Sequence, residues 1–193
     1  MHKRLFFICL LILPVKPVFS DAIGLEILTL TSHVSRYTIQ LGKQYHRKLS
    51  SDGRHVLTPG IEAYYDKQSD NAFASVNSLR FVIAGYFDSM NHFSGYFAFT
   101  PRWAFFKQKN LNLNVGLGPT LIFRESWNSI PEYRDDGYYH ESKVFSSTYQ
   151  YKLILGGDIN IHYRLNGKTE FVWSIIPGLP YVVTHAFGLR WIR

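Results

Sequence analysis

The stretch Leu111-Asn112-Leu113-Asn114-Val115-Gly116-Leu117-Gly118 alternates apolar residues with small or polar ones. This period of two indicates a β-strand with one apolar face, because successive side chains of a strand point to opposite sides. Other runs of strand-forming residues recur along the chain, which shows no convincing helix and no internal repeat. We therefore predict eight strands, at 25–33, 56–65, 79–87, 95–106, 111–123, within 149–164, at 169–176 and at 182–192.

Polar segments connect these strands. Asn166-Gly167 is the strongest hairpin signal, because this pair accepts positive φ at both turn positions. The segment 107–110 is predicted to be a short turn, and 124–143, which is charged and rich in tyrosine, a surface loop. If the chain starts in the periplasm, the segments after odd-numbered strands lie at the outer end of a barrel, where bacterial barrels carry their longer loops.

Residues 1–20 have the pattern of a secretory signal peptide. A basic start is followed by an apolar core at 5–15, and Val18-Phe19-Ser20 suits cleavage before Asp21. That core is too short to span a bilayer as a helix. Cys9 is the only cysteine, so the mature domain, predicted as one unit over 21–193, contains no disulfide.

Composition decides the fold class. Aromatic residues make up 17% of the chain and charged residues 18%, and an exported, disulfide-free chain with many aromatics and alternating strands is typical of a transmembrane barrel. About 170 mature residues suffice for eight strands of roughly 10–12 residues with their loops. We predict an all-β, eight-stranded, antiparallel up-and-down transmembrane β-barrel in the outer membrane of a Gram-negative bacterium.

The charge balance excludes one class of partner. Removal of residues 1–20 reduces the 21 basic residues to 18 against 14 acidic ones, an excess of four. Such an excess suits a phosphate-bearing partner, but no run of lysine or arginine supports nucleic-acid binding. The eight histidines are scattered and no cysteine remains after processing, so no metal site is expected.

Five motifs carry a resemblance to a known family. They are Leu28 to His33, Phe87-Asp88-Ser89-Met90-Asn91, Gly116 to Thr120, Arg124 to Pro131, and Ile176-Pro177-Gly178. Their residues and their order resemble the outer-membrane lipid A palmitoyltransferase family (PagP) over nearly the whole mature chain, although His33 and Asp88 are further apart than in that family. The motif R-x-x-W-N-x-I-P at 124–131 is the most specific of the five.

The resemblance implies a lipid A acyltransferase that moves a fatty acyl chain from a phospholipid donor to a hydroxyl of lipid A, as a monomer without a cofactor. The family's essential residues fall on His33, Asp88 and Ser89. Imidazole titrates near neutral pH, so His33 is expected to be the general base and Asp88 to orient it. Ser89 is expected to act either as a nucleophile or as an oxyanion donor. Arg124 is expected to contact lipid phosphates.

The chain also departs from the family pattern. Only residues 21–24 precede the first strand, so the family's N-terminal helix is expected to be absent, and Met90 replaces an aromatic residue. Thr100 stands where the family's acyl pocket has a glycine floor. A larger side chain there fills volume that methylenes would need, which implies an acyl chain shorter than palmitate.

Three other interpretations remain open. Asp88-Ser89 is also ordinary turn chemistry, and His33 is also a plausible rim residue. His33 and Ser35 share a strand face and would suit a lipid A deacylase. The remaining alternative is a non-catalytic small outer-membrane barrel with ligand-binding or envelope-stabilising loops.

Overall fold

The computed structural model of the protein describes residues 21–34, 48–69, 76–88, 90–127, 140–144, 147–178 and 182–193. They form nine β-strands: β1 (Ala22–His33), β2 (His55–Gln68), β3 (Ser78–Phe87), β4 (Phe93–Lys107), β5 (Leu111–Glu125), β6 (His140–Val144), β7 (Ser147–Arg164), β8 (Thr169–Gly178) and β9 (Val182–Ile192). Within these ranges, no helix is long and apolar enough to cross a bilayer.

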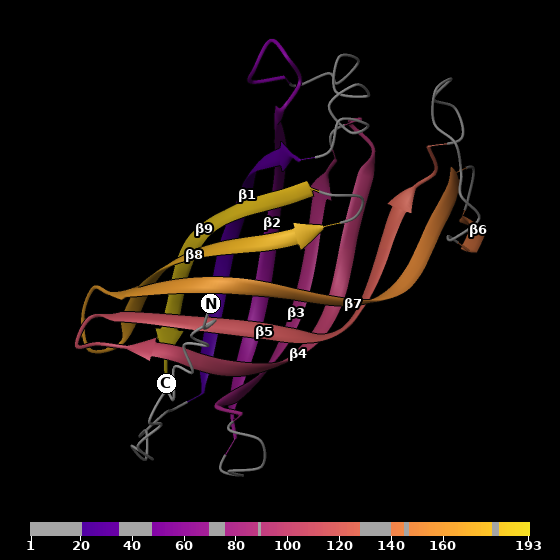
Figure 1. The fold of residues 1–193 in the computed structure, drawn as a ribbon. Coiled ribbons are helices and arrows are strands. Elements are labelled where there is room, and N and C mark those ends of the chain that lie inside the picture. The colour runs from indigo at the N-terminus through magenta and orange to yellow at the C-terminus, as the bar shows by residue number, and fades with distance from the viewer. Residues whose placement is uncertain are drawn as a thin grey trace, which may run out of the picture.

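Eight of the strands close into one barrel. Every neighbouring pair is antiparallel, in the order β5-β4-β3-β2-β1-β9-β8-β7, and a further pairing of β5 with β7 completes the ring. The first and last strands pair from Ala22–Ile192 to His33–Val182. The predicted eight-stranded antiparallel up-and-down barrel is confirmed. We call the end at Ala22 and Ile192 the terminal end, and the end at His33 the loop end (Figure 1).

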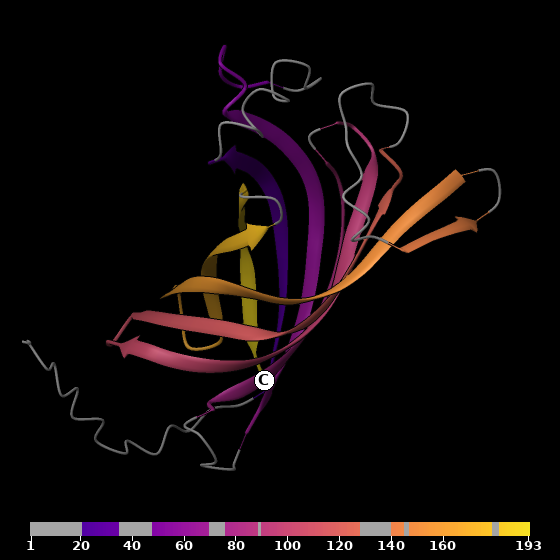
Figure 2. The same ribbon diagram turned by 45° about the vertical axis from the view of Figure 1, so that its right-hand side comes forward.

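Strand β6 is the one described strand that the sequence pattern did not predict. It begins inside the predicted loop 124–143, extends one residue beyond it, and pairs with the start of β7, from His140–Tyr151 to Val144–Ser147. The resulting hairpin projects beyond the barrel wall (Figure 2). Five residues without alternation carry no period-two signal, so only the pairing with β7 defines this strand.

The barrel is apolar outside and polar inside. Leu153 and Leu155 on β7 are 69% and 70% exposed on the outer surface. Arg80, Arg102 and Glu62 are buried in the interior. This arrangement inverts that of a water-soluble domain and is the pattern of a barrel whose outer wall faces hydrocarbon.

A bulge in β1 reverses which residues face inward. Before the bulge, the buried residues have even numbers, for example Glu26 and Leu28. After the bulge, they have odd numbers, namely Thr31 and His33. The register shifts between Leu28 and Leu30 against both neighbouring strands. One additional residue in a strand moves all later side chains to the opposite face, so this bulge turns His33 into the barrel.

A buried ionic network crosses the middle of the barrel. The guanidinium of Arg80 bonds both oxygens of Asp66, at 2.6 Å and 2.9 Å, and also donates to Asn160 Oδ1 at 2.8 Å. Arg102 donates to the same Asn160 oxygen and to Asp158 at 2.9 Å. Bidentate pairs between arginine and carboxylates fix geometry as well as charge. The network therefore ties β2, β3, β4 and β7 together across the interior.

The wall opens between β7 and β8 towards the loop end. Their pairing runs from Arg164–Glu170 only as far as Ile159–Ile175. Beyond this point β7 diverges from β8 but stays paired with β5 (Figure 1). Near its start β7 also pairs with β6, on the edge from which β8 has separated. Pro177 of β8, which has no N–H to donate, lies in the diverging part. The interior is consequently bordered by two separating strands on this side.

The hairpin at 165–168 has the predicted position but not the predicted conformation. Among the described glycines only Gly53 has a positive φ, of 72°, so neither Asn166 nor Gly167 adopts the left-handed region. Instead Asn166 Oδ1 accepts hydrogen bonds from the backbone N–H groups of Lys168 and Thr169, both at 2.9 Å. The side chain of Asn166 thus replaces the backbone twist that an Asn-Gly pair usually supplies.

The substitution Gly167→Ala tests this turn conformation. A Cβ at Gly167 meets nothing within 4 Å, so the free energy of unfolding should stay unchanged or rise by about 0.4–1 kcal/mol as the unfolded chain loses freedom. The control Gly53→Ala places a side chain at positive φ and should lower stability by about 1–2 kcal/mol. Urea unfolding in lipid vesicles, followed by tryptophan fluorescence, measures both. A loss for Gly167→Ala as large as for Gly53→Ala would contradict the described turn.

The variants Arg80→Leu and Arg164→Leu test the ionic network, because they make the same substitution at a buried and at a partly exposed arginine. Arg80 is fully buried, so its removal leaves Asp66 without its main partner and should cost about 3–5 kcal/mol of unfolding free energy. The Arg164 side chain is 40% exposed and lies 3.7 Å from Glu170, so its loss should cost roughly 0–1 kcal/mol. The same unfolding experiment applies, and equal losses would argue against a stabilising role of the network.

Candidate functional site

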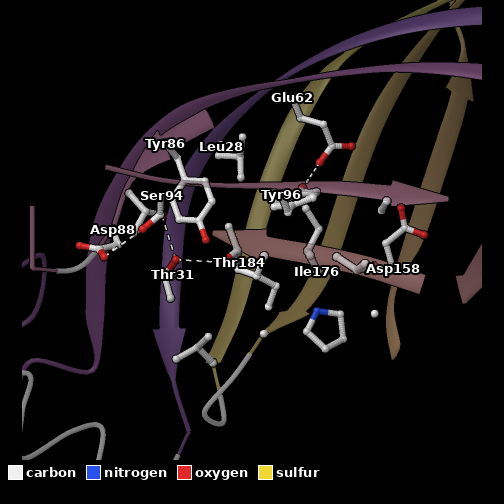
Figure 3. Close-up of a pocket in the computed structure, with 18 of the residues that line it drawn as sticks. Leu28, Thr31, Glu62, Tyr86, Asp88, Ser94, Tyr96, Asp158, Ile176 and Thr184 are labelled. Atoms are coloured by element: carbon white, nitrogen blue, oxygen red, sulfur yellow. Dashed lines mark hydrogen bonds between the residues drawn. The ribbon is translucent and has the colours of Figure 1, made fainter. Parts of the chain in front are cut away.

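A cavity of about 160 Å³ lies inside the loop end of the barrel. Its wall is largely apolar, with Leu28, Val82, Ile122, Ile154 and Ile176 contributed by five different strands. Figure 3 shows Asp88 and Ser94 on one side of this cavity, and Glu62 with Tyr96 and Asp158 towards its inner end. The ionic network forms the inner limit, because Asp158 is bonded to Arg102.

The structure brings four of the five predicted site residues to this cavity. His33, Asp88, Thr100 and Arg124 all line it. Ser89 lies outside the described residues. His33 ends β1, Asp88 follows β3, Thr100 lies within β4 and Arg124 near the end of β5. Each of the four side chains belongs to a residue that is at most 7% exposed.

Asp88 organises the turn between β3 and β4. Its Oδ1 accepts the backbone N–H groups of Met90 and His92, both at 2.9 Å. Its backbone carbonyl accepts the N–H of Asn91, whose φ of 65° lies in the left-handed region that asparagine tolerates. The predicted turn chemistry of this segment is therefore present in the structure.

Asp88 also joins the turn to the segment that follows β5. Its Oδ2 accepts the indole N–H of Trp127 at 2.8 Å and the hydroxyl of Ser94 at 3.1 Å. Burial raises the pKa of the Asp88 carboxyl, while the hydrogen bonds from His92 and Trp127 act in the opposite direction. The carboxylate of Asp88 accepts four hydrogen bonds and so links the β3–β4 turn to the segment after β5. We call this set of contacts around Asp88 the clasp.

Arg124 belongs to the same assembly. Its Nε donates to Gln150 Oε1 at 3.1 Å, and its guanidinium carbon lies 4.3 Å from the ring centroid of Trp127. A guanidinium over an indole face is a favourable cation–π arrangement. Trp127 is thus held between Asp88 at its N–H and Arg124 at its ring.

Other polar groups of the cavity belong to the strands of the barrel wall. His33 donates its backbone N–H to the carbonyl of Arg54 at 2.8 Å. Thr31 shares hydrogen bonds with Thr58 at 2.8 Å and with Thr184 at 3.0 Å. The hydroxyl of Thr100 is buried and has no hydrogen-bond partner among the residues described.

Several cavity residues with defined contacts were not among the predicted site residues, and Trp127 and Glu62 are two of them. Trp127 lies within the R-x-x-W-N motif, and the presence of a tryptophan in that motif was the signal that could have identified it. Glu62 follows the apolar Ile61 on β2, and its carboxylate accepts a hydrogen bond from the Tyr96 hydroxyl. Alternation along a strand separates two such neighbours onto opposite faces, but it does not reveal which strand supplies the partner of Glu62. Within the described ranges, no group of three or more potential ligands could hold a metal ion.

Comparisons with known proteins support the fold but no family. No protein-family model matches the sequence, and no curated protein matches it. The solved structure of Neisserial surface protein A (NspA) superimposes with a TM-score of 0.53 at 9% identity, covering 90% of this chain and 97% of that chain. The chain has the fold of a small outer-membrane barrel.

A second solved structure gives a weaker match. It is Ail, the attachment invasion locus protein of Yersinia pestis, in complex with the heparin analogue sucrose octasulfate. Its TM-score is 0.44 at 14% identity, covering 89% of this chain and 94% of that chain. These values are too low to carry an argument about the present site.

The predicted membership of the lipid A palmitoyltransferase family is wrong, and so is the predicted acyltransferase activity. The solved structure whose fold the chain shares is named a surface protein, and no family model links the sequence to a transferase. The motifs at 87–91, 124–131 and 176–178 lie at or near strand ends and are rich in Asp, Ser, Asn, Pro and Gly, whereas those at 28–33 and 116–120 lie within β1 and β5. These residue types recur wherever strands stop and turn, so short matches of this kind arise without common function.

The substitution Asp88→Asn tests the clasp. An amide group has only one acceptor oxygen, so Trp127 or the turn amides must lose a charge-assisted bond worth about 1.5–3 kcal/mol. Hydrogen exchange of the Trp127 indole N–H, measured by NMR, should accelerate by roughly tenfold or more. The control Asp52→Asn disturbs only the exposed turn in which Asp52 binds Ser50 and Arg54. Unchanged exchange in Asp88→Asn would rule the clasp out.

Proposed function

We propose that this protein is a non-catalytic outer-membrane barrel that binds a ligand in its loop-end cavity. The cavity carries the proposal, because a small barrel that served only as a membrane scaffold would fill this space with side chains. Its wall and rim differ in chemistry, which is typical of sites that fix a ligand in one orientation.

The ligand is an amphipathic molecule. The apolar wall, which includes Leu28, Ile122 and Ile154, suits an apolar body. At the rim, Asp88 and Arg124 offer charge to a polar group, although both already hold protein contacts. A ligand at the rim would therefore engage groups whose positions are set in advance, which limits the cost of ordering them.

The divergence of β7 and β8 offers a path from the membrane. Ile154 and Gly157 on β7, together with Ile176 and Pro177 on β8, border the separation and also line the cavity. An apolar molecule residing in the surrounding lipid could enter there without crossing water. Outer-membrane lipid is accordingly the proposed environment of the wall and the proposed source of the ligand.

The proposed orientation places the loop end at the cell surface and the terminal end in the periplasm, as in bacterial barrels whose chain ends face the periplasm. We further propose that the protein reaches the outer membrane after cleavage of the signal peptide at 1–20. One chain closes the ring by itself, so a monomer is sufficient for the function.

Two tryptophan substitutions at adjacent positions test ligand binding. Ile154→Trp fills the cavity, whereas Leu153→Trp adds the same side chain on the lipid-facing surface, where Leu153 is 69% exposed. Native mass spectrometry of barrels purified from outer membranes measures the molecules that remain bound. The wild type and Leu153→Trp should retain a small molecule of defined mass, and Ile154→Trp should retain at least tenfold less. Absence of a bound molecule from the wild type, or equal retention by both variants, would refute the proposal.

A further inference from the structure

A second cavity, of about 260 Å³, lies at the terminal end of the barrel. The ionic network separates it from the loop-end cavity, with Arg102 and Asp66 on its inner wall. Its outer limit includes Lys107 at the end of β4 and Gly167 in the β7–β8 turn, both exposed. This cavity therefore opens at the end opposite His33 and Asp88.

Positive charge is in excess around this cavity. Four cationic side chains line it, against two carboxylates; they are Arg102, Lys107, Arg164 and Arg190 against Asp66 and Glu170. The two carboxylates lie on the inner wall, where Arg190 bridges Asp66 at 3.0 Å and Glu170 at 2.7 Å. Arg164 also lies 3.7 Å from Glu170. Two carboxylates do not balance four cations, and the cations at the mouth are Lys107 and Arg164. Two cations in a partly enclosed space attract an anion.

Three strands align polar side chains beneath this mouth. Lys107 of β4 is opposite Asn112 of β5, and Asn112 is opposite His162 of β7. Residues directly opposite on antiparallel strands present their side chains on the same face of the sheet. Lys107, Asn112 and His162 thus form one row across the inner wall of the cavity.

The polar atoms of this row include buried acceptors without partners. His162 is 3% exposed, and its Nδ1 lies 3.1 Å from the carboxylate of Glu170. Because a carboxylate only accepts, Nδ1 carries a proton, and when the ring is neutral Nε2 is an acceptor. Nε2 has no hydrogen-bond partner in the described part of the chain, and neither do Asn112 Oδ1 and Gln68 Oε1, which line the same cavity.

We propose that the terminal-end cavity binds a small molecule that carries both an acidic group and hydrogen-bond donors, such as an amino acid with an acidic side chain. Lys107 and Arg164 bind the anionic group at the mouth. His162 Nε2, Asn112 and Gln68 accept hydrogen bonds from its ammonium or hydroxyl groups further inside. An anion without donors would satisfy the cations and leave these acceptors unpaired, which is unfavourable for buried polar atoms.

The matched probes L-glutamate and glutarate separate these two contributions. They have the same carbon chain and two carboxylates, and only glutamate carries an ammonium group. Simple attraction to the cations favours glutarate, which has the larger negative charge, whereas the proposed site favours glutamate. The binding of each probe to the full barrel in detergent micelles is followed through the NMR signals of the His162 ring.

Glutamate is expected to shift the His162 signals in a saturable manner and to bind at least tenfold more tightly than glutarate. The double variant Lys107→Gln/Arg164→Gln should weaken glutamate binding at least tenfold. Lys109→Gln removes an exposed cation from the same β4–β5 turn that does not line the cavity, and it should leave the affinity unchanged. Glutarate binding as tight as glutamate binding, no saturable shift, or equal effects of the two variants would each overturn the proposal.

A variant of the loop-end cavity provides a further control. Ile154→Trp fills the other cavity and should leave glutamate binding unchanged, since the ionic network lies between the two sites. A loss of glutamate binding in Ile154→Trp would show that the two cavities do not act independently and would contradict the assignment of glutamate to the terminal end.

Discussion

Closure of the sheet by hydrogen bonds between β1 and β9 is the constraint on which the rest of the structure depends. A strand edge facing hydrocarbon would leave backbone N–H and C=O groups without partners, at a cost of several kcal/mol for each group. The pairing from Ala22–Ile192 to His33–Val182, together with the pairing of β5 with β7, removes that cost around the ring except where β7 and β8 diverge. Closure also forces alternate side chains inward. The polar interior is a direct consequence of a ring that stands in lipid.

The ionic network turns this interior into two compartments. Arg80 and Arg102 meet at Asn160, in the middle of the barrel, and their carboxylate partners Asp66 and Asp158 lie on opposite sides of that point. The compartment on the Asp158 side has apolar walls and a charged rim, and the one on the Asp66 side has cations at its mouth and buried acceptors below. The same buried charges that hold the strands in register therefore define two sites with different chemical preferences.

The failure of the family resemblance has a physical cause. Asp88 was predicted to be catalytic from an enzyme motif that also includes Asn91, and in the structure both residues stabilise a turn. The carboxylate of Asp88 accepts backbone N–H groups, and Asn91 adopts a positive φ. The additional contact of Asp88, to Trp127, joins segments that are far apart in sequence. Local chemistry explains why these residue types stand at strand ends, and a match among such residues carries little information about catalysis.

Alternation and turn residues determined the strands of the barrel within a few residues, because a strand half exposed to lipid repeats every two residues wherever it pairs. They also determined which end carries His33, Asp88 and Arg124. Only the tertiary structure decided the bulge that turns His33 inward, the conformation of the turn at Asn166-Gly167, the short strand β6 and the partners of Arg80 and Glu62. Each of these depends on contacts between strands distant in sequence or on a local choice between nearly equal backbone conformations. The free energies of these contacts and conformations cannot be derived from any single stretch of the sequence.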